Sequence, residues 1–129
     1  MTADAEMPPA RACQGVSMSD EARILTVLTT TDDEVKAREL AAGAIRQRVA
    51  ACAQISAPVT SVYRWEGEVQ SDPEWQVLFK TSEARYDDLE AYIRQAHDYD
   101  VPEIIATRVV RGGADYLAWV AEETSAPGT

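Results

Sequence analysis

Two long extended segments, residues 51–65 and 68–81, flank the dipeptide Glu66-Gly67 near the middle of the chain. Gly67 supplies the positive φ that a two-residue hairpin turn requires, so the two segments predict a single β-hairpin. At ~3.3 Å per residue a strand of this length spans on the order of 50 Å, whereas most strands have ~5–6 residues. One small domain cannot cover such a ribbon along its whole length.

Two prolines divide this ribbon. With the turn at Gly67, Pro58 and Pro73 fall at nearly the same level, and because proline has no N–H for the ladder, a bulge or bend is predicted there. The inner half would belong to the domain's own sheet, and the outer half, with Tyr63 and Trp65 on one face, would project beyond it. A two-stranded ribbon is marginal in water, so we expect sister chains to cover it; the alternative is an arm that curls over its own domain.

Shorter segments on both sides of the hairpin predict the remaining elements. Apolar, β-branched runs predict a central strand at 23–30 and a last strand at 104–111. Helices are predicted at 31–49, 82–97 and 114–122. The order βαββαβ with a C-terminal helix predicts an α+β, ferredoxin-like domain, whose helices pack on one face of a four-stranded antiparallel sheet.

The first two helices have predicted starts and faces. Thr31 and Glu34 have the spacing of a capping box, which makes Thr31 the expected N-cap, and Glu83 stands at the positive end of the second helix. The predicted buried faces consist of Val35, Ala42, Ile45 and Val49 in the first helix and of Tyr86, Leu89, Ile93 and Ala96 in the second.

We expect a disordered leader at 1–20, one domain at 21–124 and a flexible tail at 125–129. The leader has paired prolines and no apolar periodicity, so it cannot bury enough surface to offset the entropy of ordering. It is not expected to be a signal peptide, because Asp4 and Glu6 stand where a basic region belongs and no continuous apolar core follows.

The charge balance bears on partners and compartment. The chain has 22 acidic and 12 basic residues, a net charge of −10, and no basic cluster, so neither nucleic acid nor an anionic membrane is an expected partner. The longest uncharged stretch, 49–63, is shorter than the ~20 apolar residues of a transmembrane helix. Two cysteines, Cys13 and Cys52, make no disulfide framework, which favours a cytoplasmic location.

Six short motifs occur in a characteristic order: VLTT at 27–30, AACA at 50–53, YRWEGE at 63–68, FKT at 79–81, HDYDVPEI at 97–104 and YLAW at 116–119. Together they resemble the CutA divalent-cation tolerance family over about residues 23–122. The resemblance implies a homotrimer of ferredoxin-like subunits, similar in architecture to PII signalling proteins, whose hairpins pair with the neighbouring subunit. It also implies a role in tolerance of divalent cations, copper above all, and no enzymatic activity.

Cys52 and His97 are the candidate metal ligands, for copper or another divalent ion. A thiolate suits Cu(I) and an imidazole suits Cu(II) or Zn(II). Cys52, which matches a cysteine common in the family, also fits as a small buried hydrophobe in its alanine-rich run, and His97 also fits as a structural residue at the end of the second helix. Thr29 and Tyr92 stand where some relatives have further cysteines, which argues against a site with several thiols.

Aromatic and charged residues are candidates for subunit contacts or for a cleft between subunits. Aromatic side chains dominate buried interfaces, and Trp75 is assigned with them to interface or core. The candidate interface or cleft residues are Tyr63, Trp65, Glu68, Lys80, Tyr99, Glu103 and Trp119.

Three functions compete. The first is a trimeric metal-tolerance protein that binds metal directly, and the second is a PII-like small-molecule sensor or adaptor that uses clefts between subunits, without physiological metal binding. The third, a cysteine-dependent enzyme using Cys52 and His97, is disfavoured because nucleophilic catalysis needs an exposed, activated thiol with a base in reach.

Overall fold

The computed structural model describes residues 23–125. The predicted leader, with Cys13, lies outside the described residues, as does the predicted tail apart from Ser125. The elements in chain order are β1 (Ile24–Thr31), α2 (Glu34–Arg46), β2 (Cys52–Ile55), β3 (Val59–Trp65), β4 (Glu68–Ser82), a 3₁₀ turn (Glu83–Arg85), α3 (Tyr86–Ala96), β5 (Ile105–Arg108) and α4 (Ala114–Glu123).

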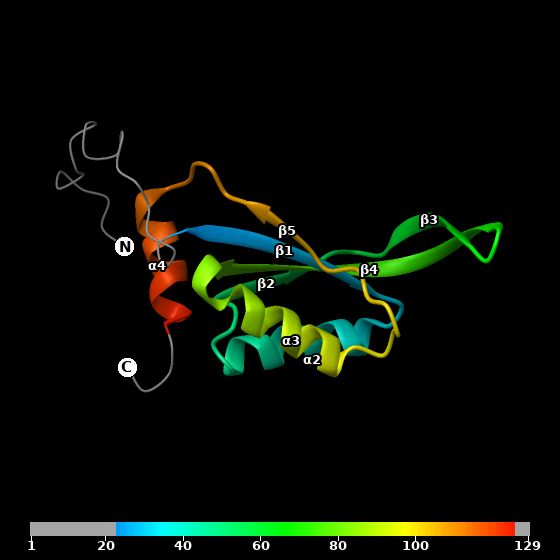
Figure 1. Ribbon diagram of the computed structural model, residues 1–129, viewed down its shortest axis with the longest axis horizontal. Helices are drawn as coiled ribbons and strands as arrows, with labels where there is room; N and C mark the ends of the chain where they lie inside the picture. The colour runs from blue at the N-terminus through cyan, green and yellow to red at the C-terminus, as the bar shows by residue number, and fades with distance from the viewer. Residues whose placement is uncertain (1–22, 126–129) are drawn as a thin grey trace.

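The strands form one antiparallel sheet in the order β2-β4-β1-β5, and β3 pairs only with the outer part of β4. Helices α2 and α3 lie on one face of this sheet, and α4 lies at the end opposite the projecting hairpin (Figure 1). This is the predicted ferredoxin-like α+β arrangement, in which two split βαβ halves share one sheet.

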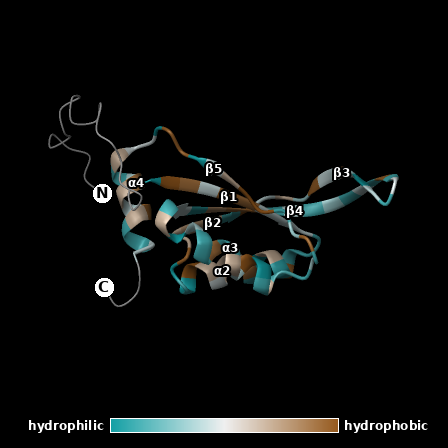
Figure 2. Ribbon diagram, viewed as in Figure 1, coloured by the Kyte–Doolittle hydropathy of each residue, from teal (hydrophilic) through white to brown (hydrophobic). Residues whose placement is uncertain are grey.

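The main core lies between the sheet and helices α2 and α3. Its most buried side chains are Val27, Val77 and Phe79 from the strands and Ala37, Ala44, Leu89 and Ile93 from the helices. Much of β1 is hydrophobic in Figure 2, as expected for a strand paired on both sides. A second, smaller cluster of Ile24, Ala51 and Val120 holds α4 against the end of the sheet.

The long hairpin and its predicted bulge are both present. Glu66 and Gly67 have φ values of 52° and 82°, as a two-residue turn of the primed type requires. The register runs from Ile55 opposite Val77 to Val59 opposite Glu74, so residues 56–58 on one strand face only residues 75–76 on the other. The one extra residue is a β-bulge, and it lies at the level of the two prolines.

Beyond the bulge, residues 59–74 form a two-stranded ribbon that we call the arm. None of them belongs to either core cluster, and Figure 1 shows the arm extending away from the domain rather than curling over it. Val62 and Val69 are 66% and 68% exposed on it. The arm therefore contributes nothing to the domain's cores within one chain.

The predicted N-cap of the first helix is wrong. Asp33 is the N-cap, and its carboxylate accepts a hydrogen bond from the Lys36 amide at 3.2 Å. Thr31 is instead the last residue of β1, paired with Trp75. The ladder holds Thr31 in an extended conformation, so the helix begins two residues later than the local motif indicates.

The predicted buried face of the first helix is also wrong in part. Val35, Ala42 and Ile45 are exposed, whereas Val49 is buried beyond the end of α2. The buried residues of α2 are Ala37, Leu40, Ala41, Gly43 and Ala44. Small residues occupy this buried face because α3 packs closely against α2. A Cβ added to Gly43 would lie 2.2 Å from the Tyr92 hydroxyl oxygen.

Like the first helix, which was predicted at 31–49 and spans Glu34–Arg46, two further elements are shorter than expected. The second helix begins at Tyr86 after a 3₁₀ turn, and the last strand has four residues instead of eight. All four residues of β5 are exposed, because this strand pairs only with residues 25–28 of β1 and its other edge has no partner in the described chain. The predicted inner face of α3 agrees with the structure at Leu89 and Ile93, which are fully buried.

Candidate functional site

A groove of about 610 Å³ lies between the arm and the segment that follows α3. Four of the predicted cleft residues meet there: Tyr63, Trp65, Tyr99 and Glu103. The remaining lining residues, which the sequence analysis did not select as cleft residues, are Thr30, Ser61, Val62, Glu74, Asp100 and Val101. The hairpin register could have indicated Glu74, because it places this residue opposite Val59 at the base of the arm.

Tyr99 joins the two walls of this groove. Its hydroxyl donates to Oε2 of Glu74 at 2.7 Å, so the segment after α3 is tied to the base of the arm. Burial, together with the Glu74 carboxylate, raises the pKa of Tyr99 far above its ordinary value. The side chain therefore remains a neutral phenol at physiological pH.

Tyr63 makes a similar contact on the arm itself. Its hydroxyl donates to Oδ2 of Asp72 at 2.5 Å, and this hydrogen bond is the main cause of the raised pKa of Tyr63. Both tyrosine hydroxyls are thus directed at carboxylates. The groove is lined by three aromatic rings and three carboxylates, and none of its lining residues is Lys, Arg or His.

His97 is buried just behind this groove, at the end of α3. Its Nε2 lies 2.7 Å from the Thr30 carbonyl oxygen, and its Nδ1 accepts a hydrogen bond from the Tyr99 amide at 3.1 Å. Nε2 is therefore the protonated nitrogen of a neutral ring. The imidazole also packs on the Tyr99 ring, with the two centroids 4.6 Å apart.

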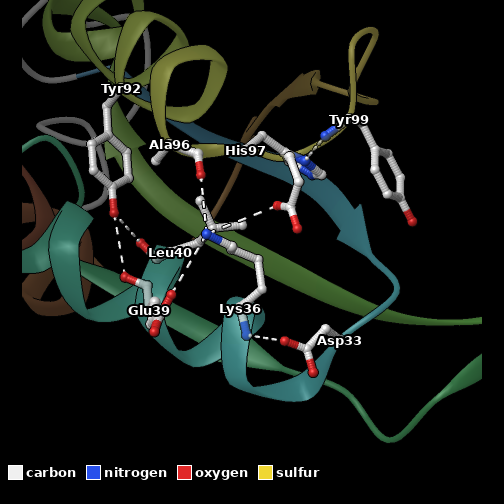
Figure 3. A network of polar contacts seen from close by, with 9 residues as sticks. Asp33, Lys36, Glu39, Leu40, Tyr92, Ala96, His97 and Tyr99 are labelled. Atoms are coloured by element: carbon white, nitrogen blue, oxygen red, sulfur yellow. Dashed lines mark hydrogen bonds and ion pairs between the residues drawn. The ribbon is translucent and has the colours of Figure 1, made fainter.

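Lys36 secures the same end of α3, as Figure 3 shows. Its ammonium group donates to the Ala96 carbonyl oxygen at 3.4 Å and lies 3.9 Å from the Asp98 carboxylate. The contacts of His97 with the Thr30 carbonyl and the Tyr99 amide give it a structural role. A metal ion at either ring nitrogen would have to displace a backbone hydrogen bond, and the metal-ligand role of His97 stays a prediction.

Cys52 lies elsewhere in the sheet. It pairs with Lys80, whereas the Thr30 carbonyl that His97 contacts belongs to a residue paired with Gln76. The two levels are four residues apart on β4, which corresponds to ~13 Å. Cys52 and His97 are therefore not brought together within one chain.

The surroundings of Cys52 are formed by α4. Burial and a hydrogen bond with the Cys52 thiol raise the pKa of Tyr116. The Lys80 ammonium lies 5.8 Å from the centroid of the Tyr116 ring and donates to Oε1 of Gln54 at 2.7 Å. Trp119 packs on the same tyrosine, with a centroid distance of 5.6 Å.

The predicted cleft residues thus fall into separate places. Trp119 lies on α4 and Lys80 lies beside it, at the end of the sheet opposite the arm. Glu68 lies next to the hairpin turn, paired with Trp65. Among residues 23–125, no three His, Cys, Asp or Glu side chains are grouped to hold a metal ion. No helix in the same part of the chain is long and apolar enough to cross a membrane.

Comparison with known proteins gives a consistent result. Residues 25–123 match the family described as CutA1 divalent ion tolerance protein. The divalent-cation tolerance protein CutA of Thermus thermophilus is 40% identical over 98 residues, which covers 76% of this chain and 95% of that protein. The protein of the same name from Yersinia pestis is 38% identical over 96 residues, covering 74% and 81% of the two chains.

Solved structures agree with these sequence matches. The divalent cation tolerance protein of Thermus thermophilus superposes with a TM-score of 0.77 at 38% identity, covering 79% of this chain and 99% of that one. CutA1 from Oryza sativa superposes with a TM-score of 0.78 at 36% identity, covering 80% and 94%.

Proposed function

Because this chain belongs to the CutA1 divalent ion tolerance family, we propose that it contributes to divalent-cation tolerance as a homotrimer and catalyses no reaction. The observation that supports the assembly is the arm, whose apolar side chains and free strand edge have no cover in a single chain. Such an edge is a template for pairing with another chain.

A second surface supports the same assembly. The sheet face away from α2 and α3 has a shallow hollow lined by Leu28, Gln54, Ile55, Ser56, Gln76 and Leu78. An antiparallel sheet in a monomer normally presents polar side chains on its solvated face. Apolar Leu28 and Leu78 at the centre of this face fit a surface that is covered by sister chains.

In this proposal copper is bound at a site that the chains share. Three subunits supply three copies of each ligand, so a set that is incomplete in one chain can be completed in the trimer. Cys52, which is a free and half-buried thiol, is the soft ligand that Cu(I) prefers. Catalysis is not proposed, because a nucleophile needs its base within hydrogen-bond reach and Cys52 lies far from His97.

Two measurements on the full chain test this proposal. Light scattering after size exclusion is expected to give three times the chain mass of 14.1 kDa, and a monomer would refute the assembly. Calorimetric titration with copper and zinc is expected to show binding that Cys52→Ser removes and Cys13→Ser, the control, retains. If neither metal binds better than ~1 mM, direct metal binding fails while the trimer is judged by its mass.

The groove supports a second candidate function, a sensor or adaptor for a small molecule. Its volume of about 610 Å³ falls in the range of pockets that hold small ligands, ~300–1,000 Å³. It lies on the arm that the proposed neighbour would approach, so assembly and ligand binding would influence each other. Binding of a small ligand that survives removal of all metal with a chelator would favour this function.

A cytoplasmic location is part of the proposal, supported by the free thiol of Cys52. A structurally similar protein from Archaeoglobus fulgidus, 24% identical, is described as periplasmic. Fractionation of cells that express the full chain distinguishes the two compartments: recovery in a periplasmic extract would overturn this part of the proposal.

A further inference from the structure

We propose that the groove between the arm and residues 99–103 binds a small organic cation with a quaternary ammonium group. This inference rests on the second candidate function, in which the groove is a ligand site. It names the chemical class of that ligand from the walls of the groove, their charge and the hydrogen bonds already made there.

Aromatic rings form the walls. Tyr63, Trp65 and Tyr99 come from the arm and from the segment opposite it, so a ligand between them meets ring surfaces on two sides. The ring of Tyr99 is fixed by its packing on His97 and by its bond to Glu74, and the ring of Tyr63 is fixed by its bond to Asp72. A cation within ~6 Å of such ring faces is attracted by their quadrupoles.

Carboxylates make the groove negatively charged. Glu74, Asp100 and Glu103 line the groove, and no basic side chain does. Neither Asp100 nor Glu103 has a hydrogen bond or an ion pair within the described residues, so both are available to a ligand. An anionic ligand would meet uncompensated negative charge here, whereas a cation is favoured.

The same contacts argue against a bare metal ion. The carboxylates of Glu74 and Asp72 already accept tyrosine hydroxyls, and no three ligand groups converge within residues 23–125. A primary ammonium group brings three donors, for which only the carboxylates of Asp100 and Glu103 are unpartnered in the described chain, so the three ring faces are what favour a quaternary group. A quaternary ammonium group has no N–H donor and fits aromatic walls with carboxylates at the rim.

Tyr63 and Trp65 lie on one face of the arm and Val69 on the other. Arg64 pairs with Val69, and because side chains alternate along a strand, this pair lies on the opposite face of the ribbon from Tyr63 and Trp65. A neighbouring chain that covers Val69 therefore does not need to cover the rings of Tyr63 and Trp65, but it would lie beside Val62, which also borders the groove. The probes are for this reason applied to the native assembly.

Choline and its uncharged carbon isostere, 3,3-dimethyl-1-butanol, are a matched pair of probes for the full chain in its native assembly. Calorimetry or ligand-observed NMR is expected to show saturable choline binding, at least ~10-fold tighter than binding of the isostere. Absence of saturable choline binding, or equal binding of the two probes, would overturn the proposal.

Variants locate the site. Tyr99→Leu is expected to weaken choline binding at least ~10-fold, whereas Tyr99→Phe, which keeps the ring, stays within ~3-fold of the wild type. The double variant Asp100→Asn/Glu103→Gln is expected to weaken binding at least ~5-fold. Its control, Asp115→Asn/Glu122→Gln, removes the same charge from exposed positions on α4 and should leave binding unchanged.

The outcomes separate this inference from the proposed function. If the control pair loses as much affinity as the groove pair, the attraction is a general effect of net charge and the groove assignment fails. If the chain is a metal-binding trimer without choline binding, only this inference fails. If the chain is a monomer whose choline binding depends on the Tyr99 ring, the inference stands and the trimer fails.

Discussion

Removing the arm is the sharpest test of how this chain assembles. The paired residues Val59 and Glu74 can be joined by Asn-Gly in place of residues 60–73, which gives a two-residue turn between strands already in register. Because no residue from 59 to 74 belongs to a core cluster, the shortened chain is expected to fold with its cores intact. It is also expected to be a monomer.

The size of the effect follows from what each arm exposes. Val62 and Val69 are about two-thirds exposed, and burying the exposed part of each side chain stabilises an assembly by ~1–2 kcal/mol. The free edge of β3 offers several outward N–H and C=O groups, each worth ~1 kcal/mol when paired. The total is on the order of 5 kcal/mol per arm, which is comparable to the cost of association when three arms act together.

Light scattering and thermal unfolding over a range of concentrations check this prediction. The wild type should be a trimer whose melting temperature rises with concentration, and the armless chain should be a monomer whose melting temperature does not. A milder pair separates the arm from general charge effects. Val62→Lys/Val69→Lys should weaken assembly, and Gln47→Lys/Gln95→Lys, at exposed positions after the end of α2 and on α3, should not. An armless chain that remains trimeric would refute the reasoning.

Three further predictions concern the residues around the groove and the helix start. His97→Gln is expected to lower the free energy of unfolding by ~1–3 kcal/mol, measured with denaturant, because the buried imidazole bonds two backbone groups; an unchanged value would contradict its structural role. Asp33→Ala is expected to cost ~1 kcal/mol in the same assay, whereas Thr31→Val should not show the loss of a cap. Since the pKa of Tyr99 is raised in the folded state, its stabilising contribution is fully present below pH ~10 and is lost as the pH rises through the folded pKa. Tyr99→Phe should therefore flatten the alkaline decline in stability, and an identical decline in both proteins would count against the Glu74 contact.

Local turn chemistry made the hairpin predictable. Gly67 located the turn, and the two prolines located the bulge, because both residue types restrict the backbone whatever surrounds them. The order of elements and the fold class followed from periodicity for the same reason. These features depend on few long-range contacts.

Tertiary contacts decided the features that the sequence analysis missed. Thr31 has the side chain of an N-cap, but pairing with Trp75 keeps it in the sheet. The inner face of α2 was misassigned because Val35 and Ile45 are the more hydrophobic choices, whereas the close approach of Tyr92 to Gly43 requires small residues.

The candidate site was predictable in its residue types but not in its grouping. Tyr63 and Tyr99 were selected as aromatic residues near a cleft, yet their bonds to Asp72 and Glu74 depend on how the segment after α3 reaches the arm. Lys80 and Trp119, selected in the same way, lie at the other end of the sheet. Periodicity within one element cannot indicate which end of a sheet a distant loop will reach.

The single extra residue at 56–58 shifts the pairing with β4 by one position between β2 and β3. On β2 the odd-numbered Ala53 lies opposite Phe79 and packs towards the helices, whereas the odd-numbered Tyr63 lies opposite Gln70, on the other face of β4. The bulge reverses this parity, so the odd-numbered residues of β3 face the other way while β4 runs on unbroken. Because the turn at Glu66 and Gly67 fixes the pairing of β3 with β4, deleting one residue from this stretch would remove the bulge and still leave Tyr63 opposite Gln70 on the same face. Such a deletion would change the direction in which the arm leaves the sheet, whereas the side chains that the arm presents would stay the same.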